Sequence, residues 1–305
     1  QMNKKYSYYT GTLVKTMKKC IAFHSYKGGT GKSTISANIS VLLVKMGYNV
    51  LLVDMDVYAP TLQTYFNQEP KYWINNFLFN TAEFENVIYD LTHLIRNFPD
   101  TKESQQELGK FFVAFSNSSK EEITKLDGTL RHDASKLELL RKFILIKEEL
   151  AYQNDIDYII IDTSPGVRYW SINSLAIADL IILSLKMDSI DIEGTKKMAN
   201  EIYSAFTKLG TKSLLLFNRA AGYCLPPNLI LETSYAPEAN YANVMSEQSN
   251  ITNTVKKDVN MEIIGNIPCY CDIQFDSKEF LTVLKHPYHP FTHLLSDLVE
   301  KIERI

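Results

Sequence analysis

The stretch YKGGTGKST, Tyr26 to Thr34, decides the fold and most of the chemistry of this chain. It follows the apolar run CIAFHSY at residues 20–26 and precedes a segment whose apolar residues recur at helical spacing up to Gly47. Glycines let successive backbone N–H groups turn toward an anion, and a helix N-terminus adds a favourable dipole. A strand, this loop and a helix in that order therefore predict a phosphate-binding loop.

The side chains within the loop have different expected roles. We expect Lys32 to contact the β- and γ-phosphates of a nucleotide and the Ser33 hydroxyl to bind Mg²⁺. An ordinary glycine turn before a helix would leave Lys32 unexplained. Lys27 is not needed for an anion cradle, so its purpose depends on the rest of the sequence. The residues predicted to contact the nucleotide here are Gly28, Gly29, Thr30, Gly31, Lys32, Ser33 and Thr34.

Two further apolar runs end in acidic residues, as a magnesium nucleotide site requires. DYIIIDTSPG places Asp162 at a strand end, where we expect it to hold Mg²⁺ through a coordinated water. LLVDMD ends with Asp54 and Asp56, and strand alternation puts both on the same side. One is expected to support the metal shell and the other to orient the attacking water. Pro165-Gly166 could let a switch segment follow the γ-phosphate.

Seven short apolar runs alternate with helical patterns along the 305 residues. Because the runs are apolar on both faces, they predict buried parallel strands. The expected fold is a single α/β P-loop domain, with a mostly parallel twisted sheet of seven or eight strands and helices on both faces. The runs are residues 20–26, 49–56, 110–116, 157–164, 179–186, 213–219 and 262–268.

The predicted domain occupies residues 17–305. Residues 1–16 are polar and rich in Lys and Tyr, and we expect a mobile tail or an expression remnant, with a small basic contact as the alternative. Insertions are expected at about 64–150, with a helix around Ser135–Leu150, and at about 220–260. Insertions of that length in a compact domain are usually lids or partner surfaces.

Two helical stripes have a predicted place in the fold. Residues 191–209, with Met198, Phe206 and Leu209 on one stripe, should cover one face of the sheet. The stripe of residues 290–305 suits either a membrane-surface helix or core packing. A membrane-surface helix would need a polar face rich in Lys and Arg, whereas acidic residues match or exceed basic ones here. The pattern therefore predicts core packing.

The composition says more about the cellular environment of the protein than about its binding partner. The formal net charge of -3 excludes a basic nucleic-acid coat but leaves local basic patches open. Cys20, Cys224, Cys269 and Cys271 lack the spacing of a disulfide framework or a four-ligand zinc site, which favours a reducing cytoplasm. No apolar run approaches the roughly 18 residues of a spanning helix. We expect a cytoplasmic protein that could lie at a membrane or nucleoid surface.

Together these motifs resemble the deviant Walker-A ATPases of the MinD/ParA type, in the MinD-like branch, whose loop reads KGGxGK[ST]. Here the loop is Lys27–Ser33, followed by Thr34. LLVDMD matches the second acidic element of the family and DYIIIDTSPG its Walker B strand. LLLFNR matches a strand that ends in a base-contacting asparagine, here Asn218 with Arg219 beside it, and IIGNIPCYCDIQ resembles the segment near the adenine, here Ile267-Pro268. The resemblance covers nearly all of residues 17–305.

The resemblance implies ATP and Mg²⁺ as cofactors and gives Lys27 a role. In the family this lysine reaches across a nucleotide-sandwich dimer to the phosphates of the partner subunit, as an arginine finger does. Asp56 is then the expected water-positioning residue, Ser33 the direct metal ligand and Thr34 a phosphate contact. Arg168, just beyond the switch, could contact the interface or a phosphate, or could be a surface arginine.

The implied function is a Mg-dependent ATP hydrolase that forms an ATP-dependent homodimer and acts in spatial organisation or partitioning. Hydrolysis would be slow and stimulated by an unidentified protein partner. A membrane surface or nonspecific DNA could serve as the matrix, although no clear feature favours either. The lysine pairs Lys196-Lys197 and Lys256-Lys257 suit DNA or ordinary solvated helix faces equally well.

Three other functions share these Walker elements. A P-loop tyrosine autokinase would usually carry a terminal tyrosine cluster and lack the signature lysine, and YSYY at Tyr6–Tyr9 is the one hint of it. An iron–sulfur carrier of the Mrp type would use a C-x-x-C pair, whereas Cys269 and Cys271 are spaced C-x-C. A pseudo-ATPase that only binds nucleotide would not need the full set Lys32, Ser33, Asp56 and Asp162.

Overall fold

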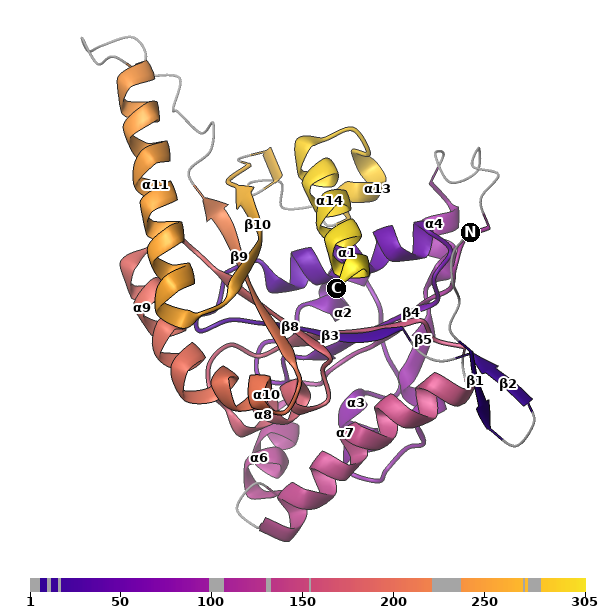
Figure 1. Cartoon of the computed structure of the whole chain (residues 1–305). Coiled ribbons are helices and arrows are strands. Elements are labelled where there is room, and N and C mark those ends of the chain that lie inside the picture. The colour runs from indigo at the N-terminus through magenta and orange to yellow at the C-terminus, as the bar shows by residue number, and fades with distance from the viewer. Residues whose placement is uncertain are drawn as a thin grey trace.

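An eight-stranded sheet crosses the molecule, with strand order β10-β9-β8-β3-β7-β4-β6-β5 (Figure 1). The computed structural model describes residues 6–9, 12–15, 18–98, 107–129, 133–153, 155–220, 237–270, 272–273 and 281–305. All neighbouring strands from β10 to β6 are parallel, and β5 pairs antiparallel with β6. This confirms the predicted single α/β domain with a mostly parallel sheet.

All seven predicted strands are present. β5 was not predicted, because its three residues are partly or fully exposed and form no apolar run. The strands of the large sheet are β3 (Lys19–His24), β4 (Val50–Met55), β5 (Ile88–Asp90), β6 (Phe111–Ala114), β7 (Tyr158–Thr163), β8 (Leu180–Leu185), β9 (Lys212–Ala220) and β10 (Glu262–Pro268).

The helices divide between the two faces of this sheet. In Figure 1, α1 and α14 lie above the sheet, and α7, α8 and α10 lie below it. The helices are α1 (Lys32–Lys45), α2 (Leu62–Phe66), α3 (Ile74–Leu78), η1 (Phe84–Val87), α4 (Thr92–Arg96), α6 (Lys120–Thr129), α7 (Asp133–Gln153), α8 (Tyr169–Ala176), α9 (Ser189–Met198), η2 (Ala199–Tyr203), α10 (Ser204–Lys208), α11 (Pro237–Val259), α13 (Thr282–Lys285) and α14 (Pro290–Arg304).

Each face of the sheet has its own hydrophobic core, as strand periodicity requires. Along the central strand β3, Cys20 and Ala22 point into the core between the sheet and helices α7, α8 and α9. Ile21 and Phe23 point into the other core, which lies between the sheet and helices α1 and α14. Because both faces are buried, β3 and the loop that follows it have a fixed position in the middle of the sheet.

The C-terminal helix α14 packs in the core, as predicted. Leu295, Leu298 and Ile302 are at most 3% exposed and join the core that contains α1. The Lys301 ammonium donates to the Ile264 carbonyl of β10 at 3.0 Å. The apolar stripe is therefore already covered by protein. Within the described ranges, no helix is both long and apolar enough to cross a membrane.

The helix predicted over residues 191–209 is continuous but irregular. It consists of α9, a π turn at η2 and α10. Met198 and Phe206 are buried as predicted, but Leu209 is 82% exposed. Leu209 is the C-cap residue of α10, so it lies beyond the last packed turn of the helix. The prediction for Leu209 was therefore wrong.

The segments outside the regular core contain more structure than the sequence indicated. β1 (Tyr6–Tyr9) and β2 (Thr12–Lys15) form a separate antiparallel hairpin inside the predicted tail. The predicted insertion at 64–150 supplies β5, β6 and the helices from α3 to α7. Of the insertion at 220–260, the structure describes α11, whereas Cys224 and Cys271 lie outside the described residues.

Candidate nucleotide site

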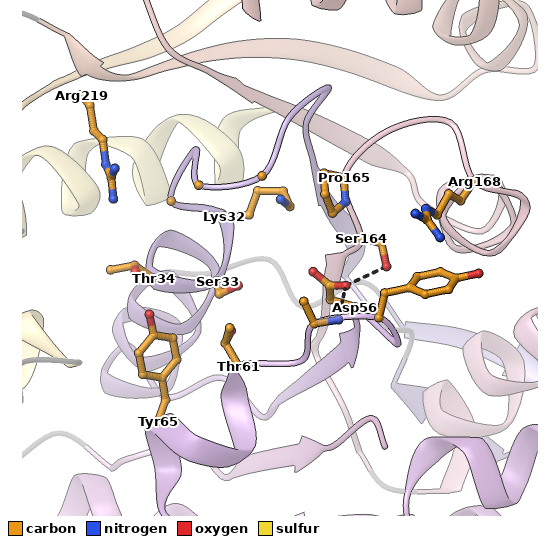
Figure 2. Close-up of a pocket in the computed structure, with 15 residues that line it drawn as sticks. Lys32, Ser33, Thr34, Asp56, Thr61, Tyr65, Ser164, Pro165, Arg168 and Arg219 are labelled. Carbon is orange, nitrogen blue, oxygen red and sulfur yellow. Dashed lines mark hydrogen bonds between the residues drawn. The ribbon is translucent and has the colours of Figure 1, made fainter. Parts of the chain in front are cut away.

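A cavity of about 400 Å³ lies where the carboxyl ends of the central strands meet the loop before α1 (Figure 2). In doubly wound sheets ligands bind at this edge. Eight predicted site residues, together with Arg168, line the cavity alongside residues that were not predicted. The lining residues are Gly28, Gly29, Gly31, Lys32, Ser33, Thr34, Asp56, Tyr58, Ala59, Thr61, Tyr65, Ser164, Pro165, Arg168 and Arg219.

The loop has the backbone conformation that its glycines permit. Gly29 and Gly31 have φ angles of 72° and 84°, in the left-handed region that favours glycine. A β-carbon at Gly31 would also collide with the Asn218 amide nitrogen. Gly31 is the N-cap of α1, so the free N–H groups of the helix begin at the cavity. The loop is therefore built to receive an anion.

Lys32 is buried beside the loop and is available to a phosphate. Its side chain is nearly covered, with 6% of the residue exposed. The ammonium donates to Ser25 Oγ at 2.9 Å, and that hydroxyl donates to the Lys27 carbonyl at 2.6 Å. Within the described part of the chain, no carboxylate lies at ion-pair distance from Lys32. A buried cation without a counter-ion fits the phosphates of a nucleotide.

Asp162 is a buried carboxylate whose oxygens are free. It is 1% exposed, and neither oxygen has a hydrogen-bond partner of good geometry among the described residues. Burial raises the pKa of Asp162 to about 6, although Lys32 and the Ser33 hydroxyl lie near enough to oppose the shift. A bound cation offsets the free-energy cost of burying such a carboxylate in its charged form. Asp162 and Ser33 therefore fit Mg²⁺.

The donor set matches magnesium better than a metal held only by protein. The described residues contain no group of three or more His, Cys, Asp or Glu side chains that could hold a metal ion. Mg²⁺ usually keeps several waters and is bound through one or two carboxylates together with substrate phosphates. One buried carboxylate beside a serine and a phosphate loop is sufficient for that kind of site.

Asp54 is not among the residues that line the cavity. It lies opposite Asp162 in the register of β4 and β7 and is fully buried. Its carboxylate accepts the amides of Asp56, at 3.0 Å, and Leu62, at 3.3 Å. Burial, reinforced by Asp162, raises the pKa of Asp54 well above its ordinary value. In this structure Asp54 fixes the turn after β4, and its metal role stays a prediction.

Asp56 is the acidic side chain that lines the cavity. Its Oδ1 atom accepts the Ser164 hydroxyl at 2.9 Å and the Ala59 amide at 3.1 Å, as the dashed lines in Figure 2 indicate for Ser164. These bonds fix the carboxylate beside the open space next to Lys32 and Ser33. A fixed carboxylate at this place can orient a water molecule.

Asn218 braces the phosphate loop. Its amide nitrogen donates to the Thr30 carbonyl at 2.8 Å, and its oxygen accepts the Arg219 amide at 2.9 Å. Ile267 is 3% exposed and belongs to the core, and neither Ile267 nor Pro268 lines the cavity. The predicted adenine contacts of Asn218, Ile267 and Pro268 therefore stay predictions, whereas Arg219 reaches the cavity.

Lys27 lies at the rim of its own site. Its ammonium is 3.8 Å from Asp188 Oδ1, and the two side chains are 38% and 48% exposed. Asp188 also caps α9 by accepting the Asp191 amide at 2.9 Å. Lys27 is not among the residues that line the cavity. The structure therefore gives it no contact with the phosphate space of its own subunit.

Sequence reasoning missed the cavity residues outside the motif letters. Tyr58 and Thr61 follow the predicted Asp56, and Ser164 follows the predicted Asp162, next to the predicted switch segment at Pro165-Gly166. Their place directly after the two strand ends was the available signal. It indicated proximity to the site, but the hydrogen bond from Ser164 to Asp56 required the structure.

Comparison with known proteins settles the family. A family model described as AAA domain matches residues 18–214. The chain belongs to this family. Among curated relatives of this AAA-domain chain, the sporulation initiation inhibitor protein Soj of Bacillus subtilis (strain 168) is 24% identical over 203 residues, 65% of this chain and 70% of Soj.

Solved structures confirm the fold of the predicted MinD/ParA type. The septum site-determining protein MinD of Pyrococcus horikoshii OT3, complexed with Mg-ADP, has a TM-score of 0.64 and 21% identity, covering 94% of this chain and 96% of that protein. An iron–sulfur cluster carrier protein of Aquifex aeolicus (strain VF5) is 48% identical, but over 58 residues, which are 19% of this chain and 16% of the carrier. The likeness to the carrier is therefore confined to a short stretch.

Proposed function

We propose that this chain is a Mg-dependent ATPase that works as an ATP-driven dimerisation switch in spatial organisation or partitioning. The observation that carries the ATPase part is the placement of complementary charges in and next to one cavity. Lys32, a buried cation, and Asp56 line the cavity, and Asp162, a buried carboxylate outside the lining, lies close to Lys32 and Ser33. Each group gains a natural partner from Mg-ATP: the phosphates for Lys32, the metal for Asp162 and a water for Asp56.

The residues divide the work of phosphoryl transfer to water. The backbone N–H groups of the loop and Lys32 bind the phosphates and neutralise charge as the terminal bond breaks. Ser33 and Asp162 would hold the magnesium, which would supply positive charge against the β- and γ-phosphates. Asp56, fixed by Ser164, orients the attacking water.

Lys27 supports the dimerisation part. Its ion pair with Asp188 is long and solvent-exposed, and such pairs contribute roughly 0–1 kcal/mol. Lys27 can therefore leave Asp188 at little cost and reach a phosphate that a second subunit presents. ATP would then favour the dimer, and hydrolysis would remove the charge that holds Lys27.

One lysine of each of the two lysine pairs is already paired with a carboxylate, which weakens the case for DNA as the matrix. Lys196 pairs with Glu193 at 3.0 Å and with Asp258 at 2.8 Å, and Lys256 pairs with Glu262 at 2.6 Å. Lysines that are already paired release fewer counter-ions when they meet a phosphate backbone. With the apolar stripe of α14 also covered, we favour a protein partner as the stimulator of hydrolysis, acting in the cytoplasm.

The fate of the γ-phosphate tests the ATPase part of this proposal. The wild-type chain is incubated with γ-labelled ATP, with Mg²⁺ or with EDTA, beside Asp56→Asn and Lys32→Ala. We expect free phosphate that depends on Mg²⁺, release lost but ATP binding kept in Asp56→Asn, and binding lost in Lys32→Ala. Label that accumulates on the protein would indicate an autokinase, and ATP binding without any release would indicate a pseudo-ATPase.

A further inference from the structure

Two contacts join the loop that carries Asp56 to the segment that follows Asp162. Ser164 Oγ donates to Asp56 Oδ1 at 2.9 Å. Four residues later, the Arg168 guanidinium carbon lies 4.1 Å from the centre of the Tyr58 ring. Figure 2 shows Arg168 on the same side of the cavity as Ser164. The segment and the loop are thus held together at two points beside the reacting end of the site.

The second contact is the main contact of Arg168. Within the described ranges, no carboxylate lies at ion-pair distance from its guanidinium. A guanidinium over an aromatic face is attracted by the ring, and its plane suits stacking better than an ammonium does. Arg168 is also the N-cap residue of α8, so holding its side chain fixes the start of that helix.

Tyr58 also contacts helix α6, which belongs to the predicted insertion at residues 64–150. Its hydroxyl donates to Asp127 Oδ1 on α6 at 3.2 Å. Burial raises the pKa of Tyr58, although Arg168 opposes the shift, so the hydroxyl keeps its proton and remains a donor. The neighbouring Leu126 is 1% exposed and anchors α6 in the core. A movement of α6 is therefore transmitted to Tyr58.

The insertion contacts α8 at both ends. Trp170, two residues after Arg168, packs edge-to-face on Phe143 of α7, with ring centroids 5.5 Å apart. Near the end of α8, the Lys147 ammonium of α7 donates to the Ile177 carbonyl at 2.8 Å. In Figure 1, α6, α7 and α8 lie on the same side of the sheet. The insertion therefore borders the switch segment and the helix that follows it.

From these contacts we propose that Arg168 is a positioning residue for hydrolysis, which clamps segment 164–168 onto the Asp56 loop, and that helix α6 steadies this clamp through Tyr58. The proposal rests on the proposed ATPase function. In this proposal Arg168 is not a phosphate ligand, because its guanidinium is stacked on Tyr58. The stacking holds the segment whose Ser164 donates to Asp56.

Single-turnover hydrolysis and ATP affinity separate these two roles of Arg168. In Arg168→Ala we expect the hydrolysis rate to fall about fivefold, the equivalent of one cation–π contact, while ATP affinity stays within about twofold. Arg168→Lys should fall between wild type and Arg168→Ala, since lysine keeps the charge and loses the plane. An ATP affinity that falls tenfold with the hydrolysis rate unchanged would overturn the clamp in favour of a direct phosphate contact.

Two further variants test the connection to the insertion. Tyr58→Phe keeps the ring and removes the bond to α6, and Asp127→Asn weakens the same bond from the other side. We expect each to lower the hydrolysis rate about twofold, and the double variant to lower it no further, because both remove one interaction. Glu121→Gln, on an exposed side chain of α6, is the matched control and should equal wild type. Additive losses, or no loss in either variant, would overturn the role of α6.

Hydrogen–deuterium exchange tests, independently of hydrolysis, whether Arg168 holds the two segments together. Arg168→Ala should speed amide exchange in residues 56–62 and 164–168, whereas Glu121→Gln should not. Unchanged exchange in both segments would overturn the clamp, even if ATP turnover fell. Conversely, a wild-type chain that released no phosphate would contradict the proposed function, and the exchange result would still report on the clamp.

Discussion

Replacing Asn218 with alanine would remove the amide that braces the phosphate loop. The side chain is 7% exposed, donates to the Thr30 carbonyl at 2.8 Å and accepts the Arg219 amide at 2.9 Å. Loss of a buried hydrogen-bond partner costs about 1–3 kcal/mol. Ser184 Oγ also donates to the Thr30 carbonyl, at 2.9 Å, so this carbonyl keeps one partner. We therefore expect the free energy of unfolding of the nucleotide-free protein to fall by about 1–2 kcal/mol.

The same change should weaken nucleotide binding without altering base preference. If the nucleotide must then order the loop, that free energy is lost from binding, and affinity falls by about 5–30-fold. Because the brace contacts the loop and not the base, ATP and GTP affinities should fall by the same factor. Urea unfolding followed by tryptophan fluorescence measures the stability, and titration calorimetry with each nucleotide measures the affinity.

Ser184→Ala is the matched control, since it removes the other donor to the same carbonyl. Each single variant should lose a similar amount of stability, and the double variant should lose more than the sum, because the Thr30 carbonyl is then unpaired. An Asn218→Ala protein of wild-type stability with a changed ratio of ATP to GTP affinity would refute this reasoning. That result would instead support the base contact that the family resemblance implies.

Three further predictions follow from individual residues. Gly31→Ala should abolish ATP binding and lower the melting temperature, since φ is 84° and the new β-carbon meets Asn218; Gly28→Ala, whose nearest protein neighbour would be 3.9 Å away, should keep the melting temperature, and an equal loss of melting temperature in both variants would contradict the loop geometry. Leu295→Ala should lower the free energy of unfolding by about 2–5 kcal/mol in urea titrations, whereas a membrane-facing position would show little change. The pKa of Asp162, raised to about 6 by burial, means that the folded state binds this proton more tightly than the unfolded state; nucleotide-free stability from this group is therefore greatest below about pH 4 and lost as the pH rises through 6. Asp162→Asn should reduce that slope in calorimetric scans, leaving the part that the raised pKa of Asp54 contributes, should raise stability at pH 7.5 and should abolish Mg²⁺-dependent ATP binding; an unchanged slope would contradict a buried, uncompensated carboxylate.

Strong periodic patterns made much of the fold predictable. The run DYIIIDT could only be a buried strand, and the glycine loop between a strand and a helix fixed the position of Lys32 and Ser33. The charge balance of residues 290–305 correctly favoured core packing over a membrane surface. In each case a local pattern and the tertiary structure required the same arrangement.

Other features depend on contacts between distant segments. β5 is three partly exposed residues that form a strand because β6 offers an edge. The exposure of Leu209 at the end of α10 has no sequence mark, because the preceding stripe residue Phe206 is buried. Asn218 resembled a base-contacting residue, yet its amide lies against Thr30, which is 188 positions away in the chain. Sequence periodicity carries no information about such pairings, which the packing of the whole sheet determines.

The most direct test of the proposed switch is the molar mass of Asp56→Ala in solution, measured by light scattering with Mg-ATP and with ADP, beside the same variant carrying Lys27→Ala. The Asp56 change prevents hydrolysis, so the ATP-bound state persists during the measurement. We predict a dimer with Mg-ATP, a monomer with ADP, and a monomer in both nucleotides once Lys27 is also removed. A monomer under every condition, with ATP still bound, would contradict a dimerisation switch.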